Sequence, residues 1–238
     1  MPRIRFEEVQ QAIERLRGLP TWLFDRRGNG GGSTSSVIYL AQYLLGSDRS
    51  VGFSRCRSGA QRHEPFIQRG FFRDEQNTAS KADAQLEMTE GFVDWRTPEQ
   101  APPPFKGKAF LLTDGGCGSA CDQFVAAIKD HSAARLLGWR TAGKLLSGIV
   151  FMPRWRGHLV LVPISSVVSP LGHEIEGVGV PPDFEIAACR AVRTVPLTMG
   201  QASSTASRDA RALIRDSSDE CRAAALRYIE KEHAAPSP

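Results

Sequence analysis

Two segments of this chain repeat one order of features: a short apolar run, a glycine-rich turn, and a serine that opens a helix-like stretch. In the first segment, residues 21–25 are followed by the turn 28–32 and by Ser33, which is a good N-cap for a helix reaching about residue 45. This order is typical of layered α/β domains, so we expect an α/β fold with a mostly parallel central sheet.

The second segment places a serine and a lysine at one predicted edge of that sheet. The apolar run 109–113 leads through a turn to Ser119, which opens a predicted helix over 120–129, and a further run follows at 134–138. If the two runs are parallel strands joined by a right-handed crossover, their carboxyl ends share an edge. Ser119 and Lys144 would then meet although they lie 25 residues apart.

The remainder of the chain predicts one large core and a C-terminal extension. We expect the core to cover residues 1–190 and a C-terminal helical extension to cover 191–238. The polar, Arg-rich stretch 53–108 is interpreted as an insertion or lid within the core that has little regular structure. Further predicted elements are helices over 6–16 and 209–232, the end of a strand over 2–6, and strands over 159–164 and 166–168.

Composition excludes several classes of function. Among 238 residues the net charge is +4, with basic and acidic residues interspersed, so we expect no nucleic acid partner. No apolar run approaches the ~20 residues of a membrane-spanning helix, and the first residues lack the apolar stretch of a secretion signal. The five cysteines are interpreted as reduced, buried thiols, and they form no zinc-binding pattern.

The chemistry of a serine and a lysine at one edge indicates nucleophilic catalysis. A serine hydroxyl is a weak nucleophile until a base takes its proton, and a lysine can be that base only where burial favours the neutral amine. The N–H of Ala120 and that of a glycine within 30–32 are candidate donors to the developing oxyanion. Three apolar neighbours are expected to bury Lys144, namely Leu145, Leu146 and Ile149.

The sequence offers two alternatives to this site, a histidine base and a phosphate-binding loop. His131 lies 12 residues beyond Ser119, ~18 Å along the same helix, so it is excluded as a base, whereas the position of His173 does not exclude it. Residues 138–144 match most of a phosphate-binding loop, but Leu145 stands where a magnesium-binding serine or threonine is needed.

Four segments in this order resemble the C-terminal processing, or tail-specific, serine peptidases, a family that includes tricorn-core and retinoid-binding relatives. Residues 25–32 resemble the family's Asp-Leu-Arg-x-Asn-x-Gly-Gly segment, and 118–122 its Ser-Ala-x-Glu nucleophile segment, with Asp in place of Glu. Residues 139–144 are similar to its Thr-x-Gly-Lys segment, and 170–183 to its closing Pro-x-Gly and Gly-Val-x-Pro-Asp signature.

The resemblance implies a crotonase-like or Clp-protease-like core that hydrolyses protein or peptide substrates near their C-termini through an acyl-enzyme, without a cofactor or metal. It assigns Ser119 as nucleophile, Lys144 as base, and Ala120 with Gly31 as oxyanion donors. The family is often periplasmic or exported, and self-association as a homo-oligomer stays open. The supporting residues that it implies are Asp25, Arg27, Asn29, Gly30, Thr141 and Glu176.

Two alternatives to this reading stay open. In the tricorn-like branch of the family another base acts with a serine and a glutamate, and Glu176 resembles the neighbourhood of that glutamate, which would make Lys144 a bystander. The chain could also be a catalytically idle relative that binds or interacts through the peptidase fold.

Overall fold

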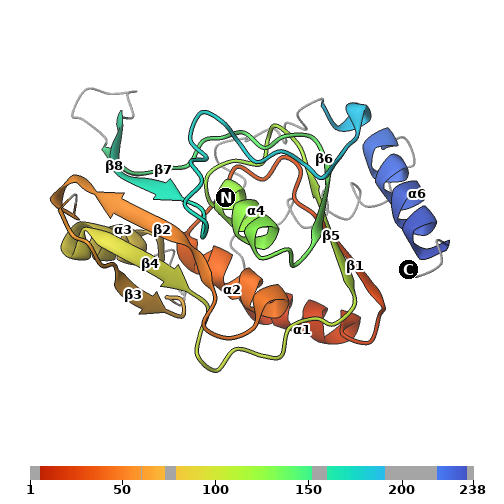
Figure 1. Ribbon diagram of the computed structural model, residues 1–238, viewed down its shortest axis with the longest axis horizontal. Helices are drawn as coiled ribbons and strands as arrows, with labels where there is room; N and C mark the ends of the chain where they lie inside the picture. Colours follow the sequence, from red (N-terminus) through yellow and green to blue (C-terminus); the bar gives the residue numbers. More distant parts are fainter. Residues whose placement is uncertain (1–5, 60, 73–78, 152–159, 191–218, 235–238) are drawn as a thin grey trace.

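The structure is a computed structural model that describes residues 6–59, 61–72, 79–151, 160–190 and 219–234. A four-stranded, all-parallel sheet forms its centre (Figure 1), in the spatial order β1-β5-β6-β9. The predicted α/β class and the predicted parallel pairing of the runs near 109–113 and 134–138 are therefore confirmed. The strands are β1 (Thr21–Asp25), β5 (Lys108–Thr113), β6 (Arg135–Gly138) and β9 (Phe184–Glu185).

Helices α2 (Thr34–Leu45) and α4 (Ala120–Asp130) pack against each other over one face of this sheet (Figure 1). Both helices follow the predicted turns. The side chain of Ser33 accepts a hydrogen bond from the N–H of Ser36, as an N-cap does. The helix α1 (Phe6–Leu16) begins and ends where the sequence predicts, while residues 2–5 of the predicted upstream strand lie outside the described residues.

The helix α6 (Glu220–Ala234) covers the opposite face of the parallel sheet (Figure 1). Side chains alternate along a strand, and the alternation in β5 divides the core accordingly. Leu111 belongs to the cluster under α2 and α4, whereas Phe110 and Leu112 pack with Ala225 of α6. The short 3₁₀ helix η2 (Ala187–Cys189) contacts α6. The first part of the predicted C-terminal helix, 209–218, lies outside the described residues, and the division into core and extension stays a prediction.

A second, mixed sheet of five strands includes part of the stretch that was predicted to be an insertion or lid. The expectation of little regular structure over 53–108 was wrong, because this stretch supplies two strands of the sheet, part of a third and a helix. Trp95 is fully buried there, and its indole N–H donates to Ser54. In spatial order the strands are β3 (Phe66–Arg69), β4 (Phe92–Arg96), β2 (Ser50–Cys56), β8 (Val160–Val168) and β7 (Leu146–Phe151), with helix α3 (Ala79–Glu90) and the 3₁₀ turn η1 (Arg57–Gly59) beside them.

The cysteines do not form the set of reduced thiols that was expected. Cys117 pairs with Cys121, and Cys189 with Cys221, while Cys56 is a buried free thiol. The second disulfide ties η2 to α6, so it belongs to the packing of the C-terminal helix. Across the described parts of the chain, no helix is long and apolar enough to cross a membrane and no cluster of side chains suits a metal ion.

Candidate active site

Ser119 lies at the corner between the end of β5 and the start of α4. Its backbone has φ 56° and ψ −125°, a conformation that residues with a side chain seldom adopt. Such a backbone typically costs about 1–3 kcal/mol and persists only where the surroundings hold it. The corner therefore holds Ser119 in an unusual conformation at the carboxyl edge of the parallel sheet, where open α/β sheets bind ligands.

The Asp122 carboxylate joins this corner to the segment that contains Lys144. It is fully buried and accepts hydrogen bonds from the N–H of Ser119 at 3.0 Å, of Gly143 at 3.1 Å and of Lys144 at 2.9 Å. Burial raises the pKa of Asp122, although hydrogen bonds from Thr141 and from these backbone groups lower it. Three N–H groups from two distant segments thus share one carboxylate.

Lys144 is adjacent to Ser119 through its backbone. The N–H of Ser119 donates to the carbonyl oxygen of Lys144 at 2.8 Å, so the two segments meet at one edge of the sheet. The prediction that the Lys144 side chain is buried was wrong. Among the residues that the structure describes, this side chain is exposed. Of its apolar neighbours, Leu145 is buried, but Leu146 is 41% exposed and faces solvent.

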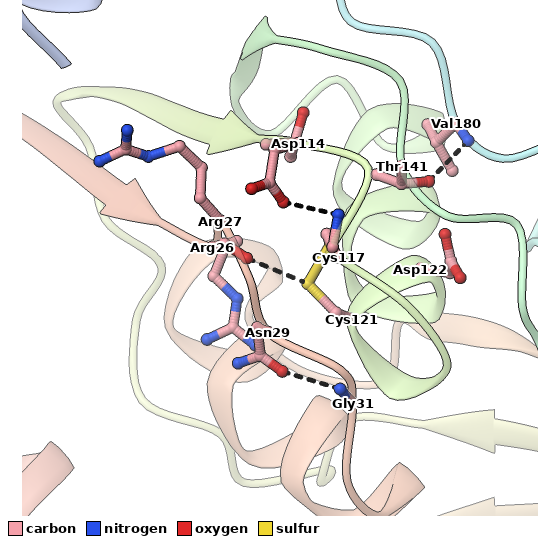
Figure 2. Close-up of a disulfide and its surroundings, with 12 residues drawn as sticks. Arg26, Arg27, Asn29, Gly31, Asp114, Cys117, Cys121, Asp122, Thr141 and Val180 are labelled. Atoms are coloured by element: carbon pink, nitrogen blue, oxygen red, sulfur yellow. Dashed lines mark hydrogen bonds between the residues drawn. A yellow bond between two sulfur atoms is a disulfide. The ribbon is translucent and has the colours of Figure 1, made fainter. Parts of the chain in front are cut away.

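Thr141 and Glu176 form hydrogen bonds that involve the segment containing Lys144. The Thr141 hydroxyl accepts the N–H of Val180 at 2.8 Å (Figure 2). A hydrogen bond from Thr141 to Asp122 also lowers the pKa of that carboxyl group. The exposed Glu176 carboxylate accepts the N–H of Leu145. Two residues implied by the family resemblance therefore fix the backbone on both sides of Lys144.

The glycine-rich turn packs directly on the serine corner. The carbonyl oxygen of Asn29 accepts the N–H of Gly118 at 3.0 Å, and its side chain accepts the N–H of Gly31 at 2.9 Å (Figure 2). The Gly31 N–H is therefore engaged by Asn29 here, so it would need to change partner to serve an oxyanion. The N–H of Ala120, as the first residue of α4, has no acceptor within the helix.

A Gly31→Ala substitution is expected to displace the turn from Ser119. At Gly31 (φ 104°) a Cβ would lie 2.6 Å from the Ser119 Cβ and 2.7 Å from the carbonyl oxygen of Gly118. We expect a loss of about 1–3 kcal/mol in the free energy of unfolding. Denaturant titration measures it, with Gly30→Ala as the matched control, because a Cβ at Gly30 meets nothing within 4 Å. Equal stability of the two variants would contradict this packing.

Asp25 and Arg27 lie at the start of the same turn but serve the packing of the chain. Arg27, whose side chain is 6% exposed, forms an ion pair with Asp25 at 2.6 Å and another with Asp219 at 2.7 Å. This arrangement ties the turn after β1 to the residue that precedes α6. The family resemblance implied a supporting role for both residues, which stays a prediction; the contacts observed join the turn to the residue before the C-terminal helix.

A cavity of about 200 Å³ adjoins Ser119 and contains two carboxyl groups that sequence reasoning missed. Asp83 and Glu87 are spaced one turn apart on α3 and are 5% and 2% exposed. Asp83 accepts from the N–H and hydroxyl of Ser35, and Glu87 accepts from Ser165. The i, i+4 spacing of these two acidic residues could have indicated that they share one face of a helix. The interpretation of 53–108 as an insertion or lid with little regular structure concealed this signal.

The two carboxyl groups should make stability depend on pH. Burial raises the pKa of Asp83 from 3.8 to about 6 and also raises that of Glu87. Between pH 4 and 6 the folded Asp83 keeps a proton that the unfolded chain has lost, so stability falls as pH rises through this window. We expect Asp83→Asn to flatten the dependence and to recover roughly 2–3 kcal/mol above pH 6. Urea titrations at pH 4, 5, 6 and 7 measure it; an unchanged slope in the variant would contradict the assignment.

His173, the histidine that sequence position had not excluded, lies at the far end of α4. Its Nδ1 is 3.3 Å from Asp130, which is the last residue of that helix, and its side chain is 65% exposed. Ser119 is at the first turn, roughly 16 Å away along the helix axis. His173 is therefore placed away from the serine corner.

The fold and this corner define a layered α/β domain that presents a serine at a strand-to-helix turn beside a glycine loop. A profile of peptidase family S41 matches residues 4–186. The chain belongs to peptidase family S41, the family of C-terminal processing serine peptidases.

Similar sequences agree with this family. A probable CtpA-like serine protease of Staphylococcus haemolyticus is 36% identical over 186 residues, which are 76% of this chain and 30% of that protein. A protein of the same description from Staphylococcus epidermidis is 32% identical over 68% of this chain and 32% of its own length. The chain thus spans about a third of the length of these curated relatives.

Two solved structures share the fold. The photosystem II D1 C-terminal processing protease superposes with a TM-score of 0.54 at 23% identity, over 76% of this chain and 39% of that one. A putative peptidase from Parabacteroides merdae gives a TM-score of 0.52 at 18% identity, over 78% and 51% of the two chains.

Proposed function

We propose that this chain is a serine endopeptidase that cleaves protein or peptide substrates near their C-termini through an acyl-enzyme formed on Ser119. The observation that carries the proposal is the shared Asp122 carboxylate, which holds the strained Ser119 corner and the Lys144 segment together. A merely structural serine at a helix start needs neither this backbone conformation nor this cross-link.

In the proposed reaction, the Lys144 amine takes the Ser119 proton as Oγ attacks the substrate carbonyl carbon. The N–H of Ala120 donates a hydrogen bond to the oxyanion. The N–H of Gly31 donates a second one after it gives up its hydrogen bond to the Asn29 side chain. The amine product departs with the proton, and water then hydrolyses the ester. The exposed Lys144 must lose solvent for this role, and a substrate lying over the corner would exclude it.

The substrate is proposed to bind in an extended conformation. β7 is an edge strand of the mixed sheet, and its first residues line the same cavity as Ser119. Unpaired backbone groups on an edge strand can pair with an added strand. A peptide tail paired with β7 would therefore pass the serine corner.

The test is digestion of a folded protein that carries an unstructured C-terminal tail, followed by intact-mass spectrometry. We expect products that have lost only tail residues, with none in the Ser119→Ala variant. Cleavage scattered along an unfolded substrate without preference for the tail would contradict tail selectivity. The absence of any cleavage would favour the alternative of an idle binding module.

A further inference from the structure

The Cys117–Cys121 disulfide encloses Ser119. It closes a ring over only three intervening residues, at the corner where β5 gives way to α4 (Figure 2). Both cysteines are fully buried. The other disulfide, Cys189–Cys221, lies with α6 on the opposite face of the parallel sheet.

We propose that the Cys117–Cys121 disulfide is the positioning element of Ser119, so that turnover requires the oxidised form of this pair. The inference rests on the proposed function, in which Ser119 is the nucleophile. A disulfide limits the conformations of the residues it encloses, and here those residues include the one with the strained backbone.

The two cysteines of this disulfide also contact two of the segments that shape the site. The carbonyl oxygen of Cys117 accepts the N–H of Ala142 at 2.8 Å, next to the Lys144 segment. The Cys121 sulfur lies 3.8 Å from the carbonyl oxygen of Arg26, at the start of the glycine-rich turn (Figure 2). Opening the ring would therefore loosen the corner from the segments on both sides of it.

Reduction is a balanced thiol–disulfide exchange. A thiolate of a dithiol reductant attacks one sulfur of the pair, the Cys117–Cys121 bond breaks, and a mixed disulfide forms. The second thiolate of the reductant then displaces the protein sulfur. The reductant leaves as a disulfide, and Cys117 and Cys121 have gained two electrons and two protons. Because both cysteines are buried, exchange is expected only during local or global opening.

The test compares two paired substitutions. Cys117→Ala with Cys121→Ala opens the ring around Ser119, whereas Cys189→Ala with Cys221→Ala is the matched control. We expect kcat and the rate of Ser119 labelling by a fluorophosphonate to fall roughly 10- to 100-fold in the first pair, with KM within about twofold. The control pair should keep the wild-type rates below its own Tm. Wild-type rates in the first pair would overturn the proposal.

Hydrogen exchange gives a readout that does not need catalysis. In the first pair the amides of 118–120 should exchange at least roughly tenfold faster than in wild type, and in the control pair they should not. If wild type shows neither labelling nor hydrolysis, the proposed function fails. The hydrogen-exchange comparison still tests whether the disulfide positions Ser119, because equal exchange of residues 118–120 in the two double variants would overturn that inference.

Discussion

Replacing Ser119 with alanine is expected to lower peptide hydrolysis by about 10⁴-fold or more. The hydroxyl is the atom proposed to form the ester, and loss of a nucleophile leaves only binding and oxyanion stabilisation. Alanine keeps the same backbone, including its φ of 56°, so the free energy of unfolding should change little. The measurement is kcat/KM on a fluorogenic tail peptide beside a denaturant titration.

Ser119→Gly is the matched control for this substitution. Glycine also lacks the hydroxyl, so it should be equally inactive, but it adopts positive φ without strain. We expect it to be more stable than Ser119→Ala by about 1 kcal/mol. Turnover in either variant above 1% of wild type would remove Ser119 from the reaction.

Replacing Lys144 with methionine is expected to lower kcat about 10²- to 10⁴-fold, the range that a general base usually contributes. Methionine has similar length but carries no amine. The exposed side chain makes no packing that the fold needs, and the backbone N–H that binds Asp122 is retained. The measurement is kcat on the same peptide, and the thermal transition should stay close to that of wild type.

Lys106→Met is the matched control, because Lys106 is likewise exposed but lies before β5, away from the site. If Lys144→Met keeps wild-type turnover, Lys144 is not the base. Attention then moves to the two carboxyl groups that share the cavity with Ser119, since a pKa of about 6 at Asp83 suits a general base at neutral pH. Asp83→Asn and Glu87→Gln would then be compared on the same peptide.

The parallel sheet was predictable because its signals are local. Residues 21–25 and Ser33 carry a strand, a turn and a cap within one short stretch, and the structure has β1 and the capped α2 at those positions. The same holds for the run that became β5 and for the helix that begins after Ser119. Each of these elements is specified by its own residues, and the crossover rule then orders the strands.

The mixed sheet could not be predicted because its stability comes from distant pairings. β2 pairs with both β4 and β8, whose residues lie far away along the chain. Trp95 is buried only because Ser54 and the neighbouring strands surround it. The polar, Arg-rich composition of this stretch favoured the interpretation as a lid, although Ser54 and Asp94 on these strands are buried.

Within the candidate site, the convergence of the Ser119 and Lys144 segments followed from topology, but their side-chain environments did not. Lys144 is exposed, and so is Leu146 at the start of β7, although the apolar neighbours of Lys144 predicted its burial. The cysteine pairs were missed because an odd number of cysteines without regular spacing suggested free thiols. The four-residue spacing of Cys117 and Cys121 across the serine was the signal that could have found the first pair.

The most direct test of the central claim is to map the site of a fluorophosphonate adduct by peptide mass spectrometry. This reagent phosphonylates a serine only where the surroundings activate its hydroxyl. We expect one adduct, on Ser119, which disappears in Ser119→Ala. A folded wild-type chain that forms no adduct, or forms it on another serine, would contradict the account.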